Sequence, residues 1–174
     1  TEIDDQAAGV KALRERPYVD GSRVGIYGTS YGGYASLMCL LRHPDVFQAA
    51  AASSSVTDWR NYDTIYTERY MGLPSENPEG YRASSPVHFA GNLKGKLFLM
   101  HGMMDDNVPP QNTYLVMEAL IKANKDFDLL LLPNRRHGFG SEPYMVRRRW
   151  DYFVRHLQGN EPPNRRTAAQ GKRE

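Results

Sequence analysis

Ser30 is the residue of this chain whose surroundings most clearly suggest nucleophilic chemistry. It lies in a G-x-S-x-G pattern over residues 28–32 (GTSYG), between a short apolar run and a helix-compatible stretch. A serine in that context is typical of a nucleophile elbow, a sharp turn whose flanking glycines avoid collisions with neighbouring elements. A glycine-rich turn that carries a solvated serine is the alternative interpretation.

The rest of the chain supplies partners that could activate this serine. A serine hydroxyl is a weak nucleophile at neutral pH, and it needs a base that an acidic group keeps in the correct tautomer. Of the five histidines, His137 is the one on a glycine-bearing loop after a late strand, so it is the predicted base. Asp105 and Asp106 are both candidates for the acid, because their spacing does not choose between them. His101 closes a strand, where a histidine usually packs or bonds locally.

The same chemistry requires hydrogen-bond donors for a developing oxyanion. The backbone amide of Tyr31, directly after the nucleophile, is the first expected donor. The second donor normally comes from a loop after an earlier strand, and this sequence contains no such segment.

Apolar runs and helical patterns alternate along the chain, which predicts an α/β fold with a parallel sheet covered on both faces. Ser30, Asp105 and His137 would then lie on loops at the carboxyl ends of strands, where sites of open parallel sheets form. The predicted strands cover residues 24–27, which we expect to be buried, 47–52, 96–101 and 128–132. The predicted helices cover residues 1–15, 31–43, 109 or 110 to 123, and 144–157, with Met145, Trp150, Phe153 and Leu157 as apolar contacts of the last. Residues 56–81 form an aromatic excursion with short helices.

Composition limits the classes of protein that this chain can belong to. Its 174 residues suffice for one domain, and 40% hydrophobic and 24% charged residues fit a globular protein. The net charge of +2 argues against nucleic-acid binding, and the basic clusters at 147–149 and 165–166 are interpreted as solvated. The single cysteine, Cys39, excludes an intrachain disulfide and is expected in the core. No apolar run approaches the roughly 20 residues that span a bilayer, and no spacing typical of metal ligands is present.

Three motifs together resemble the dipeptidyl peptidase IV-like enzymes of the prolyl oligopeptidase family of serine peptidases. They are residues 30–34 (SYGGY), 101–108 (HGMMDDNV) and 62–72 (YDTIYTERYMG), and the resemblance extends from near Thr1 to about Leu157. Thr29 departs from it, since dipeptidyl peptidase IV carries tryptophan before the nucleophile.

The resemblance implies roles for several residues. It implies that Asp105 is the acid. It implies a pocket for the residue before the cleaved bond, preferably proline, formed by Val56, Trp59, Tyr62, Tyr66, Asn107 and Val108. A flat pyrrolidine ring suits a small aromatic box. Tyr70 and Tyr81 are interpreted as ordinary core.

The resemblance also implies an organisation. Residues 1–157 would be the C-terminal portion of an α/β-hydrolase domain, and residues 158–174 a polar, flexible tail. The first strands of the sheet, an N-terminal β-propeller and a tyrosine that supplies the second oxyanion donor would lie upstream, so the chain is expected to be a piece of a longer protein. About four strands of a sheet of eight would remain, and one would have an unpaired edge.

The function implied is hydrolysis of peptide bonds after proline or alanine near a peptide's amino terminus, through an acyl-enzyme. Another serine acyl hydrolase, either an acylaminoacyl peptidase or an esterase, and a non-catalytic binding module are the alternatives. We expect no cofactor and no metal, a peptide substrate as partner, and no nucleic-acid partner. Relatives often dimerise through the hydrolase domain, so a homodimer is a further expectation. Relatives occur in the periplasm, at cell surfaces and in the cytoplasm, which leaves the compartment open.

Overall fold

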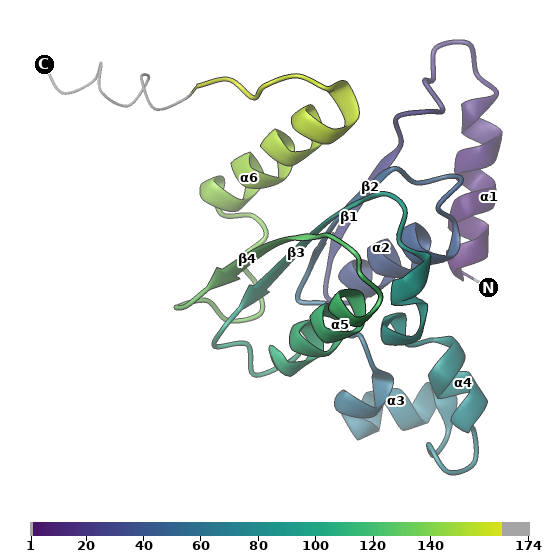
Figure 1. Ribbon diagram of the computed structural model, residues 1–174. Helices are drawn as coiled ribbons and strands as arrows, with labels where there is room; N and C mark the ends of the chain where they lie inside the picture. The colour runs from purple at the N-terminus through teal and green to yellow at the C-terminus, as the bar shows by residue number, and fades with distance from the viewer. Residues whose placement is uncertain (1, 165–174) are drawn as a thin grey trace, which may run out of the picture.

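Four parallel strands form the centre of the molecule, and helices cover both faces of the sheet (Figure 1). The computed structural model describes residues 2–164. The strands lie in the spatial order β1 (Gly25–Thr29), β2 (Ala49–Ser53), β3 (Lys96–Gly102) and β4 (Asp128–Leu132), and each neighbouring pair is parallel. The longer helices are α1 (Glu2–Arg14), α2 (Tyr31–Arg42), α5 (Gln111–Lys122) and α6 (Pro143–Phe153). The predicted fold class, a parallel sheet flanked by helices, is confirmed.

Alternating side chains of the two central strands build a separate core on each face. Leu97 and Leu99 of β3 pack on the side that α1, α2 and α5 cover, together with Ala50 and Ala52 of β2. Phe98 and Met100 point to the opposite side, where α6 contributes Met145 and Tyr152. The rings of Phe98 and Tyr152 stack with centroids 5.0 Å apart. Each large side chain buried in this way contributes about 1.5–3 kcal/mol relative to exposure.

The two outer strands are less covered than the central ones. The strand predicted at 24–27 exists as β1, but the prediction that it is buried is wrong, since Tyr27 is 51% exposed. Within the described residues β1 pairs with β2 alone and β4 with β3 alone, so the outer edge of each is open, and the predicted unpaired edge is present at β1. Tyr27 contacts the rings of Trp150 and Phe153 of α6, with centroids 6.3 and 6.4 Å away.

Between β2 and β3 the chain forms the short helices η1 (Trp59–Asn61), α3 (Thr64–Met71), α4 (Pro78–Ala83) and η2 (Pro86–Asn92). The aromatic excursion predicted at residues 56–81 covers the first two and the start of α4, and α3 and α4 lie at the lower right of Figure 1. Side-chain caps start three of these helices: Asp58 accepts from the amide of Arg60, Asp63 from that of Tyr66, and Asn77 from that of Gly80. The interpretation of Tyr81 as core is confirmed. That of Tyr70 is wrong, because Tyr70 is 69% exposed.

The C-terminal helix changes its winding before it ends. α6 passes at Val154 into one turn of π-helix, η3 (Val154–Gln158), which Gly159 ends in the left-handed conformation. Trp150, predicted as an apolar contact, is half exposed, and Tyr152 occupies the buried position instead. The predicted tail at 158–174 falls largely outside the described residues, which end at 164.

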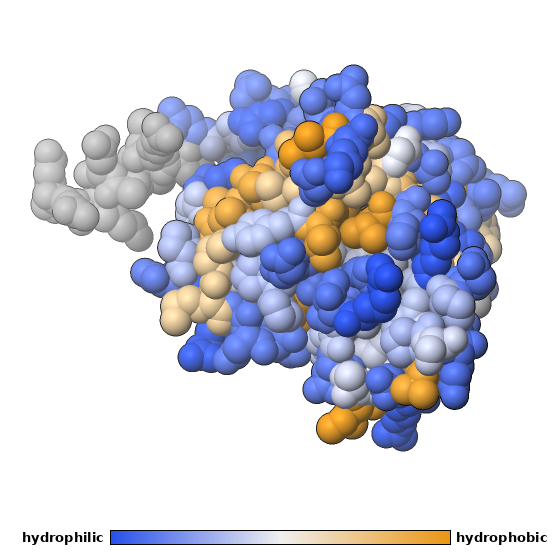
Figure 2. Space-filling model, turned by 60° about the horizontal axis from the view of Figure 1, so that its bottom comes forward, coloured by the Kyte–Doolittle hydropathy of each residue, from blue (hydrophilic) through white to orange (hydrophobic). Residues whose placement is uncertain are grey.

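The apolar residues of the described part of the chain are distributed between core and surface in three observable ways. No helix among residues 2–164 is long and apolar enough to cross a membrane. The face shown in Figure 2 carries separate apolar patches among polar residues. Cys39 is fully buried in α2, as expected.

Candidate active site

Ser30 occupies a sharp turn between β1 and α2. Its backbone has φ 61° and ψ −121°, a conformation that a non-glycine residue adopts only under strain. The amide of Ser30 donates to the carbonyl of Ser53 at 3.0 Å, which ties the turn to the end of β2. Beside it, the hydroxyl groups of Thr29 and Ser53 are 2.7 Å apart. These contacts hold the serine at the carboxyl end of the sheet.

The glycines around Ser30 are not equally constrained. A Cβ on Gly28 would overlap the backbone of Gly32, and a Cβ on Gly33 would overlap the carbonyl of Ser53. A Cβ on Gly32 would meet nothing within 4 Å. The prediction that both flanking glycines avoid collisions therefore holds for Gly28 and is wrong for Gly32, whereas Gly33 is required for close packing of α2 on β2.

Asp105 lies fully buried in the acid loop, residues 103–110 after β3. Its Oδ1 accepts hydrogen bonds from the amides of Asn107 and Val108 at 3.1 and 2.9 Å. Its Oδ2 is 2.8 Å from Nδ1 of His137. Burial alone would raise the pKa of Asp105, but the hydrogen bonds from His137 and from these amides outweigh it and hold the pKa below its usual value. The carboxylate is therefore ionised at neutral pH.

Asp106 has a different environment, although it is adjacent in sequence. Its carboxylate forms an exposed ion pair with Arg136. The geometry thus separates the two acidic residues that the spacing left open, since Asp105 contacts His137 and Asp106 points to solvent.

His137 sits on the histidine loop, residues 133–142, which backbone contacts attach to the acid loop. The amide of Met104 donates to the carbonyl of Arg135 at 2.9 Å. A Cβ on Gly102 would overlap the carbonyls of Arg135 and Arg136, so glycine lets the two loops approach. Phe139, buried in the core beside α6, anchors the loop two residues after the histidine. Because the carboxylate can only accept, Nδ1 carries the proton and Nε2 is free to accept one.

The structure brings Asp105 and His137 into contact, but the hydrogen bonds of residues 2–164 include none between Ser30 and His137. Ser30 and His137 nevertheless lie on loops at the same end of the sheet. The amide of Ser30 donates to the carbonyl of Ser53, and the hydroxyl of the next residue, Ser54, lies 3.5 Å from the carbonyl oxygen of His137. The amide of Tyr31 belongs to the first turn of α2, where N–H groups have no partner within the helix. It is thus available as a donor beside Ser30.

Aromatic rings continue from Tyr31 across the excursion. We call Tyr31, Tyr34, Trp59, Tyr62, Tyr66 and Tyr70 the aromatic cluster. Trp59 stacks on Tyr66 with centroids 6.1 Å apart, and Tyr62 meets Tyr66 edge-on at 5.3 Å. The hydroxyl of Tyr62 donates to Oδ1 of Asn107 at 3.0 Å, which links the cluster to the acid loop.

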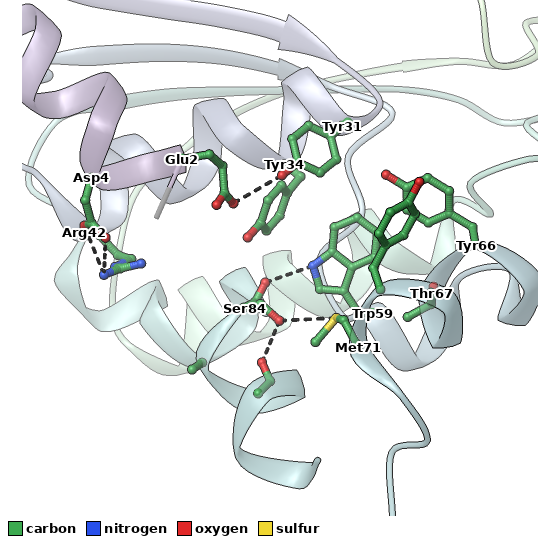
Figure 3. Close-up of a pocket in the computed structure, with 13 residues that line it drawn as sticks. Glu2, Asp4, Tyr31, Tyr34, Arg42, Trp59, Tyr66, Thr67, Met71 and Ser84 are labelled. Atoms are coloured by element: carbon green, nitrogen blue, oxygen red, sulfur yellow. Dashed lines mark hydrogen bonds and ion pairs between the residues drawn. The ribbon is translucent and has the colours of Figure 1, made fainter. Parts of the chain in front are cut away.

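The predicted pocket residues do not line one enclosed cavity. A cavity of about 840 Å³ is lined by Tyr31, Trp59 and Tyr66 among others. Glu2 also lines it and accepts a hydrogen bond from the Tyr31 hydroxyl (Figure 3). Tyr62 and Asn107 lie outside this lining. Val56 and Val108 are buried in the same core as Trp59 and Tyr34.

Comparison with known proteins decides the family. The chain matches the model of the prolyl oligopeptidase family over residues 1–160. The chain belongs to the prolyl oligopeptidase family. It is 44% identical to human dipeptidyl peptidase 8 over 140 residues, and 43% identical to a probable dipeptidyl-aminopeptidase B of Aspergillus terreus over 150 residues. The crystal structure of Porphyromonas gingivalis dipeptidyl peptidase 4 matches with a TM-score of 0.86 and 43% identity.

These matches cover most of this chain and a small part of each relative. The match to human dipeptidyl peptidase 8 covers 78% of this chain and 16% of that protein, and the match to the Aspergillus terreus protein covers 83% and 16%. The match to the crystal structure covers 90% of this chain and 23% of the crystallised one. The resemblance drawn from the three motifs is confirmed at the level of the family. The sheet is consistent with the C-terminal portion of the α/β-hydrolase domain.

Three residues that contact or fix the loops around the site were not predicted from the sequence, namely Asn112, Ser54 and His101 as a contact of Asp105. His101, expected to bond locally, contacts Asp105 as well, with Nε2 3.3 Å from Oδ2. The buried Asn112 of α5 accepts from the amide of Thr57 at 3.1 Å and fixes the start of the excursion. Ser54 has a positive φ of 46° beside the histidine loop. The run of three serines after an alanine strand was a visible signal for polar contacts there. Residues 2–164 contain no group of three metal-ligating side chains that could hold a metal ion.

Proposed function

We propose that the chain is the C-terminal, catalytic part of a serine dipeptidyl peptidase, with Ser30 as nucleophile, His137 as base and Asp105 as the acid that orients it. The observation that carries the proposal is the 2.8 Å contact between Asp105 and Nδ1 of His137, at the sheet end that also presents Ser30 on its strained turn. Family membership and relatives named as dipeptidyl peptidases support it.

In this mechanism Ser30 Oγ attacks the scissile carbonyl while Nε2 of His137 takes the hydroxyl proton. The amide of Tyr31 donates to the oxyanion. The C–N bond then breaks, the proton passes from His137 to the leaving amine, and an acyl-enzyme remains on Ser30. Water then attacks the ester while Nε2 of His137 takes its proton. The proton returns to Ser30 Oγ as the ester bond breaks, so the acid product is released and Ser30 is regenerated. Asp105 stays ionised and stabilises the imidazolium at each step.

The aromatic cluster would hold the residue before the cleaved bond, for which we propose proline or alanine. Trp59, Tyr62 and Tyr66 offer ring faces to a small apolar side chain, over a floor that Val56 and Val108 provide. Because Asn107 Oδ1 accepts from Tyr62, its amide nitrogen is directed away from Tyr62 as a donor for a substrate carbonyl. An ionised tyrosine could not donate, but burial raises the pKa of Tyr62, so the hydroxyl keeps its proton at neutral pH.

The remaining parts of such an enzyme are proposed to lie in a longer parent protein. The second oxyanion donor, the recognition of the peptide's free amino terminus and a β-propeller belong to that parent, and a homodimer through the hydrolase domain is part of the same proposal.

The test is the rate of labelling by a fluorophosphonate probe, measured on the parent and on the 174-residue chain. We expect wild-type parent to label, Ser30→Ala to abolish labelling, and the exposed Ser75→Ala to label like the wild type. A folded parent that stays unlabelled would overturn the peptidase proposal in favour of a binding module.

A substrate panel then separates the peptidase from the other acyl hydrolases. We expect faster turnover of dipeptide anilides with proline or alanine before the anilide than of acylaminoacyl anilides or simple esters. The reverse order would assign the triad to an esterase or an acylaminoacyl peptidase.

A further inference from the structure

His101 is a completely buried histidine near the end of β3, and each of its ring nitrogens has a polar neighbour. Nδ1 is 2.7 Å from Oγ1 of Thr113 on α5. Nε2 is 2.8 Å from the carbonyl oxygen of Val108 and 3.3 Å from Oδ2 of Asp105. A carbonyl oxygen can only accept, so Nε2 carries the proton. Burial lowers the pKa of His101, which leaves the ring neutral, with Nδ1 accepting from the Thr113 hydroxyl.

Both backbone groups of Val108 take part in holding the acid loop. The amide of Val108 donates to Oδ1 of Asp105, while its carbonyl accepts from His101. The same Nε2–H lies next to Oδ2, the oxygen that meets His137. Oδ2 thus lies between two imidazoles, one from the central strand and one from the histidine loop. Rotation of the carboxylate away from His137 would lose both contacts.

We propose that His101 is a positioning residue for the Asp105–His137 pair: its Nε2–H fixes Asp105 Oδ2 and the Val108 carbonyl in the arrangement that orients the base. This inference rests on the proposed function. His101 acts through Asp105. A histidine that merely filled the core would affect stability without acting through Asp105.

Two substitutions of His101 place a side-chain amide at the positions of different ring nitrogens. His101→Gln can bring an amide N–H to about the position of Nε2, whereas His101→Asn reaches the position of Nδ1 and falls short of Val108 and Asp105. In the parent protein we expect His101→Asn to lower kcat about 10- to 100-fold, the size of effect known for the outer-shell groups that orient metal ligands. KM should change less than about threefold, because the ring does not face substrate, and His101→Gln should recover most of the rate. If His101→Asn does not fold, His101→Leu keeps the volume without the donor and replaces it.

The decisive control repeats the substitution in an Asp105→Asn background. If His101 acts through Asp105, its substitution should there slow the reaction by less than about threefold, because coupled residues are not additive. A full, multiplicative loss in that background would overturn the inference, as would a folded His101→Gln protein that is as slow as His101→Asn.

A readout without activity separates this inference from the proposed function. Hydrogen exchange of residues 103–110, followed by mass spectrometry of the parent, reports the Asn107 and Val108 amides that bond Asp105. We expect faster exchange in His101→Asn and near-wild-type exchange in His101→Gln. If wild-type parent is not labelled by the fluorophosphonate, the proposed function fails, and unchanged exchange in His101→Asn would independently overturn the positioning role.

Discussion

The Asp105–His137 pair and the aromatic cluster lie at the same end of the sheet, yet the chain completes only the first of them. Asp105 has no exposed side-chain surface, and amides, His101 and His137 surround its two oxygens. The aromatic cluster borders an open cavity, and its members range from the buried Trp59 to Tyr70, most of whose surface is exposed.

The difference reflects what each group requires. A buried charge is tolerated only when hydrogen bonds replace its water, so the folded chain must supply the partners of Asp105 from the acid loop, β3 and the histidine loop. Aromatic rings need only apolar neighbours, which parts of a longer protein or a bound peptide can supply as well. We therefore expect substitutions at the acid to be severe, and those in the cluster to be graded.

The largest effect is expected at Asp105. Asp105→Asn keeps the shape but removes the charge and favours the wrong tautomer of His137, so kcat of the parent should fall about 10³- to 10⁴-fold. Asp106→Asn is the matched control and should change kcat less than about threefold, because an exposed ion pair contributes little. Steady-state kinetics on a proline dipeptide anilide measure both. Equal losses in the two variants would remove the distinction between the neighbouring carboxylates.

A smaller effect is expected at the glycines of the elbow. Gly33→Ala should lower the free energy of unfolding by about 1–3 kcal/mol, because the new Cβ would press on the backbone of Ser53. Gly32→Ala should be neutral or slightly stabilising, since its Cβ enters open space and alanine favours helix. Urea unfolding of the two variants measures the free energy of unfolding of each. A destabilised Gly32→Ala with an unaffected Gly33→Ala would contradict the close approach of α2 to β2.

The smallest effect is expected in the aromatic cluster. Tyr62→Phe removes the donor to Asn107 and leaves the ring, so kcat/KM for proline dipeptide anilides should fall roughly two- to tenfold, the effect of one hydrogen bond. Tyr18→Phe removes the hydroxyl of a tyrosine that is 82% exposed and lies outside the cluster, and it should have no effect. A loss at Tyr18 as large as that at Tyr62 would mean that the effect of Tyr62→Phe is not specific to the cluster.

Much of the fold was predictable because its signals are local. Four apolar runs became the four strands, and the G-x-S-x-G pattern became a turn with a positive φ at Ser30. The burial of individual residues was less predictable. Tyr70 and Trp150 looked like core residues, and both lie half exposed or more, because a residue's burial depends on which side of its helix meets another element.

Local sequence patterns were enough to predict the strands in their order along the chain, the strained serine turn and the family. The tertiary structure was needed to see Asp105 rather than Asp106 contact His137, as the resemblance implied, and to find that Gly33 rather than Gly32 is sterically required and that His101 contacts the acid. The first depends on two loops that are distant in the chain, the second on the packing of α2 against β2, and the third on the way the acid loop folds back onto β3. Sequence spacing describes distance along the backbone, whereas hydrogen bonds and steric overlap depend on distance in space.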